Sequence, residues 1–157
     1  MATSILDEKR MLAVDDEPDV LTVLEEEILS ACPSCIFDKA TSYEQASGKL
    51  QQNEYDIVIL DIMGVQGFDL LKISVDRKFR TVMLTANVLK AEALKRSQEM
   101  GARAFLPKDK LGEIVPFLED LFLHEPRSGW ERLLDKLGDY YDQRFGKEWQ
   151  KKYPLSW

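Results

Sequence analysis

The sequence predicts an α/β fold in which a parallel β-sheet is covered by helices. Five short apolar runs alternate with segments of helical periodicity, which is typical of βαβ units and not of a sandwich or a bundle. Three of these runs are almost entirely apolar, as expected for strands buried on both faces. The candidate strands are residues 11–14, 36–37, 57–60, 82–84 and 102–106.

The first two helices have recognisable ends. Pro18 is suited to the first position of a helix, which continues until Cys32-Pro33 stops it. The second helix begins after Ser42, whose spacing to Gln45 matches a capping box. Each of these helices therefore connects two strands that are consecutive in the sequence.

Three further helices follow the later strands. The third covers about residues 68–75, and the fourth covers about 88–100 and is closed by Gly101. The fifth covers about 113–123, with Pro116 in its first turn, where proline is tolerated. Every predicted strand is thus followed by a helix.

The end of the chain differs in composition from the rest. We divide the sequence into a domain at residues 1–123, a linker at 124–129, and an amphipathic helix with an aromatic tail at 130–157. The apolar stripe of this helix either packs on its own domain or docks on a partner protein or second copy. The candidate anchors for docking are Trp149, Tyr153 and Trp157.

Charge and hydropathy exclude several classes of protein. Asp and Glu number 28 against 21 Lys and Arg, and a net charge of −7 argues against nucleic acid and anionic membranes as partners. The longest aliphatic run, residues 57–60, is far shorter than the ~20 residues that a membrane helix needs. We therefore expect a cytoplasmic protein whose partners are other proteins or, as a homodimer, a second copy.

Cys32 and Cys35 form a CxxC pair. A redox pair of this spacing normally opens a helix after a strand, whereas this pair closes a helix before a strand. A zinc site would need further ligands, and His124 is the single histidine of the sequence. We expect both cysteines to be structural.

Polar residues stand where four of the predicted strands end. Ligands bind outside the carboxyl ends of the strands in an open parallel sheet, so these side chains should meet there. Clustered carboxylates repel one another, and a Mg²⁺ ion with oxygen ligands is the natural relief. The residues are Asp15, Asp16 and Glu17 after the first strand, Asp61 after the third, Thr85 after the fourth and Lys108 after the fifth.

The charges of this group favour phosphoryl transfer. Asp15, Asp16, Asp61 and Lys108 leave an excess of negative charge, which one Mg²⁺ ion would neutralise before a phosphoryl group arrives. A carboxylate can attack phosphorus while the metal and the lysine stabilise the equatorial oxygens and Thr85 donates a hydrogen bond. No residue of the group is a strong general base for rapid turnover.

Four motifs together resemble the receiver domain of two-component response regulators of the chemotaxis-regulator type. They are Val14-Asp15-Asp16-Glu17-Pro18, Asp61-Ile62-Met63, Leu84-Thr85-Ala86-Asn87 and Gly101-Ala102-x-x-Phe105-Leu106-Pro107-Lys108. They follow the family's order and spacing over residues 7–123. The resemblance implies a flavodoxin-like (βα)5 fold, a doubly wound parallel sheet of order 2-1-3-4-5, to which this chain adds a C-terminal helix. It also implies a signalling domain that is not a turnover enzyme.

The resemblance implies a phosphoacceptor and a metal site. Asp61 would be phosphorylated by a sensor histidine kinase or a phosphotransfer protein, and the output would be contact with a downstream protein. Asp16 and Asp61 would bind Mg²⁺ directly, Asp15 through water and Met63 through its main-chain carbonyl. Lys108 would pair with the phosphoryl group.

The resemblance also implies a switch. The Thr85 hydroxyl would swing toward the phosphate while the Phe105 ring turns inward, which alters the surface made by the fourth helix, fifth strand and fifth helix. Ala86 is small and would leave the phosphate reachable. Asn87, together with Met63, would help to set how fast water removes the phosphoryl group.

Two positions depart from the family pattern. Many receivers have a proline shortly after the phosphorylated Asp and then an Asp-Gly turn, whereas this chain has Gly64-Val65-Gln66-Gly67. We expect Gly67 to keep the turn. Many receivers also have a cis proline after the lysine, where this chain has Asp109.

Two alternative functions remain at this point. A non-phosphorylated pseudo-receiver that acts as an interaction module would explain the altered loop, but Asp61, Asp16 and Lys108 are intact. A Mg²⁺-dependent phosphatase with an aspartyl intermediate would use Asp-x-Asp after its first strand. The residue two positions after Asp15 is Glu17, which argues against that enzyme.

Overall fold

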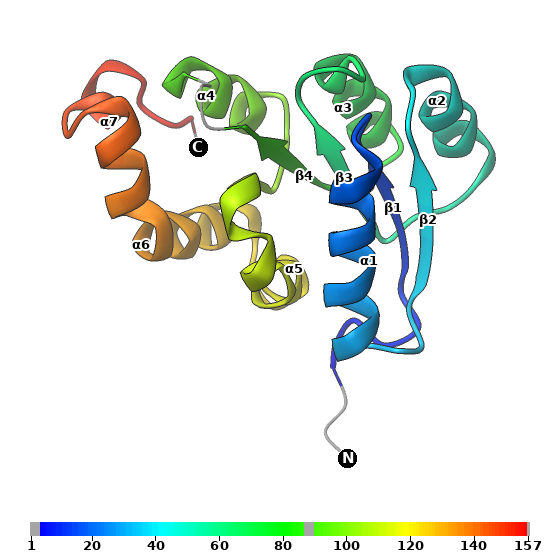
Figure 1. Ribbon diagram of the computed structural model, residues 1–157. Helices are drawn as coiled ribbons and strands as arrows, with labels where there is room; N and C mark the ends of the chain where they lie inside the picture. The colour runs from blue at the N-terminus through cyan, green and yellow to red at the C-terminus, as the bar shows by residue number, and fades with distance from the viewer. Residues whose placement is uncertain (1–3, 87–89, 157) are drawn as a thin grey trace.

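A five-stranded parallel sheet forms the centre of the computed structural model, which describes residues 4–86 and 90–156 (Figure 1). The strand order is β2-β1-β3-β4-β5, as the resemblance implied. The chain crosses over once, because β1 lies between β2 and β3. The strands are β1 (Arg10–Val14), β2 (Ile36–Ala40), β3 (Ile57–Asp61), β4 (Arg80–Thr85) and β5 (Ala104–Pro107).

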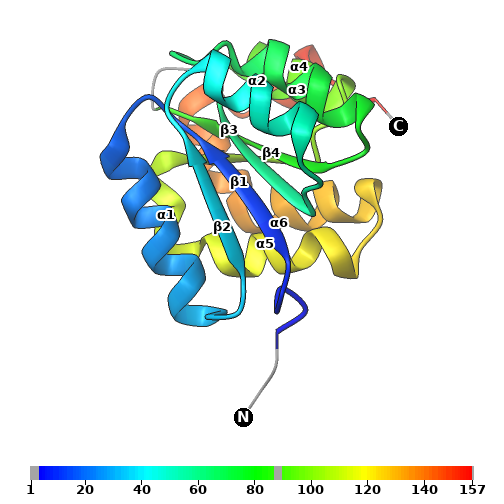
Figure 2. The same ribbon diagram turned by 90° about the vertical axis from the view of Figure 1, so that its right-hand side faces the viewer.

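Helices cover both faces of this sheet. Figure 2 shows α1 and α5 on one face and α2, α3 and α4 on the other, which makes the fold flavodoxin-like. A short 3-10 helix, η1, leads from β5 into α5. The helices are α1 (Pro18–Ala31), α2 (Tyr43–Gln52), α3 (Gly67–Asp76), α4 (Ala91–Glu99), η1 (Lys108–Glu113), α5 (Ile114–Leu123), α6 (Pro126–Phe145) and α7 (Trp149–Lys152).

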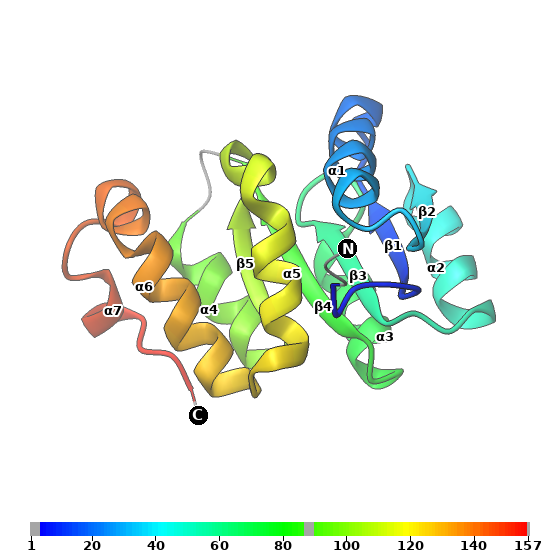
Figure 3. The same ribbon diagram turned by 90° about the horizontal axis from the view of Figure 1, so that it is seen from below.

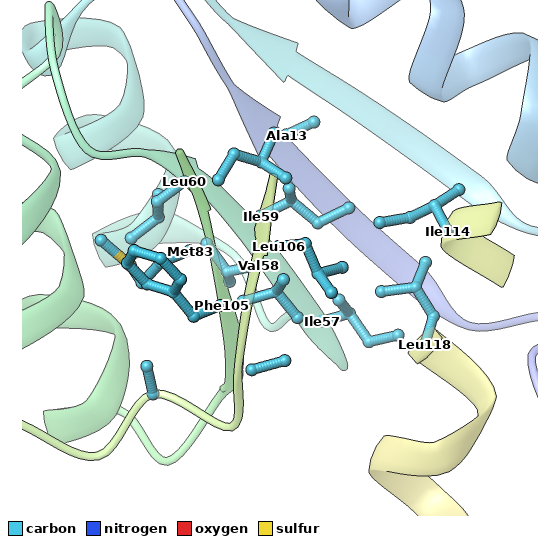
Figure 4. Packing of buried hydrophobic residues seen from close by; sticks show 14 of the residues in the cluster. Ala13, Ile57, Val58, Ile59, Leu60, Met83, Phe105, Leu106, Ile114 and Leu118 are labelled. Atoms are coloured by element: carbon cyan, nitrogen blue, oxygen red, sulfur yellow. The ribbon is translucent and has the colours of Figure 1, made fainter. Parts of the chain in front are cut away.

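The central strands are buried on both faces, as their apolar sequences predicted. All five residues of β3 are buried. Figure 4 shows how successive residues of β5 alternate, since Phe105 lies beside Met83 while Leu106 points toward Ile114 and Leu118 of α5. The edge strand β2 is longer than the sequence predicted, because Asp38 can stay in it by pairing with Arg10 of β1 at 3.0 Å.

The predicted ends of the first two helices are confirmed. Pro18 is the first residue of α1. The Ser42 hydroxyl accepts a hydrogen bond from the Gln45 backbone at 3.2 Å. The side chain of Gln45 reaches back one residue further than in a capping box, because its oxygen accepts from the Thr41 backbone at 2.9 Å. These contacts satisfy donors at the start of α2 that the helix itself cannot pair.

The last helix begins earlier than the sequence predicted. We expected a linker over residues 124–129, but α6 starts at Pro126, so two residues separate α5 from α6. Proline fits the first position of a helix because that position needs no amide hydrogen. Pro126 therefore starts the helix, and Gly129 lies within it.

The stripe of α6 packs on its own domain, which was one of the two outcomes considered. Its buried residues are Trp130, Leu133, Leu137 and Tyr141. Figure 3 shows α6 alongside α5 at the β5 end of the sheet. We call residues 126–156 the C-terminal cover.

The cover protects the edge strand β5. The Trp130 indole nitrogen donates to the Ala102 carbonyl at 3.0 Å, and the Tyr141 hydroxyl donates to the Phe105 carbonyl. An uncovered edge strand presents unpaired backbone groups that invite association with other chains. Two aromatic side chains of α6 thus give partners to one carbonyl of β5, at Phe105, and to one just before the strand, at Ala102.

Not all of the expected docking anchors are available at the surface. Trp149 is buried, and its indole nitrogen donates to Asp142 at 3.1 Å, so the expectation that it anchors a partner is wrong for this conformation. Tyr153 is half-buried and donates to Glu92 of α4 at 3.1 Å. Trp157 lies outside the described residues.

Cys32 and Cys35 are free thiols in the core. The Cys35 thiol donates to the Leu6 carbonyl at 2.9 Å. Burial, followed by the neighbouring Cys32, raises the pKa of Cys35 to about 12. A thiol held in this protonated form is a poor nucleophile, which fits the expected structural role.

No helix among residues 4–86 and 90–156 has the length and apolar character needed to cross a bilayer.

Candidate functional site

The register of the sheet brings the predicted site residues to one edge. Asp61 is the last residue of β3 and lies opposite Leu84 of β4. Thr85 follows Leu84 and lies opposite Pro107 of β5, which is followed by Lys108. Because the strands are parallel, all of their carboxyl ends meet at this edge, as the sequence predicted.

Lys108 lies at the centre of the charged group. Its ammonium nitrogen is 3.0 Å from Asp15 Oδ2 and 3.2 Å from Asp61 Oδ1, and it lies 3.8 Å from Glu17 Oε1. Only 17% of the lysine side chain is exposed, and the carboxylates of Asp15 and Asp61 are almost fully buried. Two nearly dry carboxylates therefore share one ammonium group.

Burial shapes the ionisation of this group. Burial, followed by the charge of Asp15, raises the pKa of Asp61 to about 6. Burial also raises the pKa of Asp15, against the hydrogen bond from the Glu17 backbone and the charge of Lys108. Burial alone would lower the pKa of Lys108, but the two carboxylates outweigh it and raise that pKa. The site therefore holds more negative charge than its lysine offsets.

The donor set fits a hard divalent cation. Asp15, Asp16 and Asp61 each offer a carboxylate oxygen, and these oxygens lie within 4.8 Å of one another. The buried Asp15 Oδ2 accepts no well-directed hydrogen bond within the part of the chain that the structure describes, although Lys108 lies beside it. Asp16 is exposed, which leaves room for water ligands. Oxygen ligands with retained water are the coordination that Mg²⁺ prefers.

The loop after Asp61 depends on two glycines for different reasons. Gly64 has a φ of +84°, and a Cβ there would lie 2.4 Å from Asp16 Oδ2, so this backbone must approach the carboxylate closely. Contrary to the expectation from the sequence, Gly67 does not lie in the turn but starts α3 directly after it, and a Cβ there would lie 2.2 Å from the Asp61 carbonyl. Gln66 takes the left-handed conformation, with a φ of 55°. The sequence showed Gly64 in the loop but not its contact with Asp16.

Met63 is the second residue after Asp61, and 62% of it is exposed. A methionine in the core would be buried, so packing does not explain its position. Its main-chain carbonyl belongs to the same loop as Gly64, which lies against Asp16.

The remaining predicted residues lie at the ends of β4 and β5. The Thr85 hydroxyl donates to the Ala86 carbonyl at 3.0 Å, and the Ala86 side chain is exposed. Phe105 is fully buried, and its ring centroid lies 6.0 Å from that of Tyr141 in α6. Asn87 lies outside the described residues.

Asp109 has contacts that the sequence did not reveal. Its carboxylate accepts from the Tyr140 hydroxyl at 3.1 Å and pairs with Arg144 at 3.4 Å, both in α6. The residue that follows Lys108 is therefore tied to the C-terminal cover.

The model of the response regulator receiver domain matches residues 11–118. The chain belongs to this family. The match begins at the second residue of β1, includes the other four strands and the acidic group, and ends within α5, before the cover begins. No curated protein matches the chain closely enough to count as a relative.

Solved structures of receiver domains share this fold. A CheY-like receiver protein from Methanospirillum hungatei has 20% identity and a TM-score of 0.58, covering 86% of this chain and 98% of its own. A response regulator from Chloroflexus aurantiacus has 24% identity and a TM-score of 0.56, with coverages of 84% and 99%. The non-phosphorylated HemR receiver domain from Leptospira biflexa has 29% identity and a TM-score of 0.55, with coverages of 64% and 82%.

Proposed function

We propose that this receiver is the phosphoacceptor of a two-component phosphorelay, that Asp61 takes the phosphoryl group, and that the output is contact with another protein. The observation that carries the proposal is the grouping of Asp15, Asp16 and Asp61 around Lys108 at one edge of the sheet. The donor in the cell is a sensor histidine kinase or a phosphotransfer protein, as in the family to which the chain belongs.

The reaction transfers a phosphoryl group between two nucleophiles. A carboxylate oxygen of Asp61 forms a new bond to phosphorus, the bond from phosphorus to the donor breaks, and its electron pair leaves with the donor. The product is an aspartyl phosphate. Lys108, 3.2 Å from Asp61 Oδ1, supplies positive charge beside the equatorial oxygens.

Asp15, Asp16 and Asp61 would hold the Mg²⁺ ion, with the main-chain carbonyl of Met63 as a further oxygen ligand. A bound Mg²⁺ ion neutralises charge on the phosphoryl group during transfer. Lys108, with the bound cation, would favour the ionised form of Asp61 and orient it, against burial and the charge of Asp15, which raise its pKa.

Thr85 and Phe105 are the proposed switch pair. The Thr85 hydroxyl gives up its bond to the Ala86 carbonyl and donates to the phosphoryl group instead. Phe105 is already buried, so the change at β5 is transmitted through residues that contact it. Exposed Ala86 leaves a path for the donor and for water, and Asn87 together with Met63 tunes hydrolysis.

Intact-protein mass tests this proposal. The receiver is incubated with acetyl phosphate and either Mg²⁺ or EDTA, as wild type, as Asp61→Asn, and as Asp69→Asn, which changes an exposed Asp of α3. We expect one added phosphoryl group in the wild type and in Asp69→Asn, and only in the samples that contain Mg²⁺. Full labelling of Asp61→Asn would place the phosphate elsewhere, and labelling in EDTA would remove the metal from the account.

A further inference from the structure

The C-terminal cover lies across three elements of the receiver. Its helix α6 packs on α5 and β5. Its end reaches α4, where the Tyr153 hydroxyl donates to Glu92 at 3.1 Å and the Ser156 amide donates to Gln98 at 2.9 Å. The Lys95 ammonium group donates to the Pro154 carbonyl. One segment therefore contacts all three elements of the face made by α4, β5 and α5.

The two halves of the cover are held in different ways. The first half inserts Trp130, Leu133 and Leu137 into the core. The second half, residues 140–156, combines buried Tyr141 and Trp149 with polar ties at the surface. A cleft of about 870 Å³ opens between the start of α4 and the turn from α6 to α7. The second half therefore depends on surface hydrogen bonds as well as on buried rings.

An aromatic cluster in the second half rests on β5. The Tyr141 and Phe145 rings are stacked at 5.4 Å, and Trp149 lies 5.4 Å from Phe145 and 6.1 Å from Tyr141. Tyr141 in turn contacts the Phe105 ring and donates to the Phe105 carbonyl. A small movement of β5 at Phe105 would reach this cluster directly.

A charged connection runs from the acidic site to the same half of the cover. Lys108 pairs with Asp15 and Asp61, and the next residue, Asp109, pairs with Arg144 and accepts from Tyr140. The Arg144 guanidinium also lies 4.3 Å from the centroid of the Tyr140 ring. Lys108 and Asp109 are adjacent, so the contacts of the acidic site and those of the cover meet on one stretch of backbone.

We infer that the second half of the cover is a phosphorylation-controlled lid over the α4–β5–α5 face, loosened through Lys108, Asp109 and Phe105. This inference rests on the proposed phosphorylation of Asp61. A phosphoryl group gives Lys108 a stronger partner than Asp15, so that the ties at Asp109 and Phe105 fit the phosphorylated site less well. Loosening exposes the face on which the aromatic cluster lies, which then becomes available to another protein.

The expected change in the open fraction of the lid follows from the usual strength of coupling between two sites. Allosteric coupling typically changes an equilibrium by about 5- to 150-fold. The open fraction of the lid should change by a factor in this range on phosphorylation. The first half of α6 should change little, because its side chains belong to the core.

Hydrogen exchange of the full chain tests the lid. Exchange is followed by mass spectrometry with Mg²⁺, with and without acetyl phosphate, while intact mass reports phosphorylation of the same samples. We expect exchange at residues 141–153 to rise about 5- to 150-fold on phosphorylation and exchange at 130–137 to rise much less. Unchanged or slower exchange at 141–153 in phosphorylated protein would overturn the lid and leave the proposed function standing.

Two variants locate the connection. Asp109→Asn keeps the shape of the side chain but removes its charge, so exchange at 141–153 should rise before phosphorylation and respond less to it. Arg144→Gln removes the other partner of the same ion pair, and it should change exchange at 141–153 in the same way as Asp109→Asn. Arg132→Gln is the matched control. It breaks an ion pair between Arg132, in the first half of α6, and Asp120 of α5, and it should keep the full response to phosphorylation.

The outcomes separate the two proposals. A full response in both Asp109→Asn and Arg144→Gln would remove Asp109 from the connection and overturn the inference as stated. A loss of response in Arg132→Gln would show a general loosening of α6 and would also overturn it. A wild-type chain that takes up no phosphoryl group at Asp61 would overturn both the lid and the proposed function.

Discussion

The acidic site and the C-terminal cover lie on either side of β5 and use burial in opposite ways. The site buries the carboxylates of Asp15 and Asp61 beside a single ammonium group, and it raises the pKa of both acids. The cover buries Trp130 and Tyr141, and gives each of their polar atoms a backbone acceptor. Ionisation of these acids therefore destabilises the folded protein, whereas the buried aromatic side chains of the cover stabilise it. Functional strain is concentrated at the edge of the sheet that would bind a metal and a phosphoryl group.

The largest expected effect on stability is at the cover. Trp130→Ala removes a fully buried indole and the donor to the Ala102 carbonyl, so it should lower the free energy of unfolding by about 3–5 kcal/mol. Urea unfolding followed by circular dichroism measures this loss. Gln143→Ala, on the exposed side of α6, is the control and should change stability by less than about 0.5 kcal/mol. Equal effects of the two variants would mean that α6 is not part of the core.

A substitution in the acidic site should change the free energy of unfolding in the opposite direction. Asp61→Asn removes a charge that burial and Asp15 disfavour, so in EDTA it should raise the free energy of unfolding by about 1–3 kcal/mol at pH 8. Unfolding of wild type and variant by urea at pH 4, 6 and 8 measures the difference.

The pH dependence follows from proton binding. As pH rises from about 4 to above 6, the unfolded wild type releases the Asp61 proton before the folded form does, because the folded pKa is about 6. The folded wild type then binds more protons, and its stability falls with rising pH relative to Asp61→Asn. The gain from Asp61→Asn should therefore be small at pH 4 and reach its full value above pH 7. A gain that does not depend on pH would contradict this origin.

A smaller effect is expected at the contact between the two regions. Tyr141→Phe removes the buried hydroxyl that donates to the Phe105 carbonyl, and it should cost about 1–2 kcal/mol in unfolding experiments. Tyr153→Phe, which removes a donor to Glu92 at the surface, should cost less than about 0.5 kcal/mol. If the order of these two losses were reversed, the hold of the cover on β5 would be weaker than the geometry indicates.

The smallest effect is expected for a surface ion pair of the cover. Arg132→Gln breaks the pair with Asp120, which Lys136 and His124 also approach, and it should cost about 0–1 kcal/mol. The loss should shrink further in 0.5 M salt, because salt screens exposed charges. A loss that persists at high salt would show that packing, and not charge, holds Arg132.

The sequence predicted the sheet and the acidic site well because both depend on local signals. The apolar runs mark the strands, and the polar residue after each run marks the edge where Asp61, Thr85 and Lys108 meet. The strand order came from the resemblance to receivers, since apolar runs alone do not say which strands are neighbours. The ends of α1 and α2 were predictable because Pro18 and Ser42 act within one helical turn.

The features that the sequence missed depend on contacts distant in the chain. Asp109 meets Arg144 and Tyr140 only after α6 has folded back along β5. The sequence offers Trp149 as a candidate surface anchor, because a short aromatic tail does not reveal which ring is covered. Pro126 fits the predicted linker at 124–129 as well as the start of a helix, because proline occurs in both places and the local sequence does not separate them.

The central claim is that Asp61 carries the phosphoryl group. The most direct measurement is reduction of the phosphorylated protein with borohydride, which converts an aspartyl phosphate to homoserine, followed by peptide mapping. The account predicts conversion at Asp61 alone, in samples that contained Mg²⁺, with Asp15 and Asp16 unchanged. Conversion at Asp15 or Asp16, or none in protein whose intact mass shows phosphorylation, would contradict it.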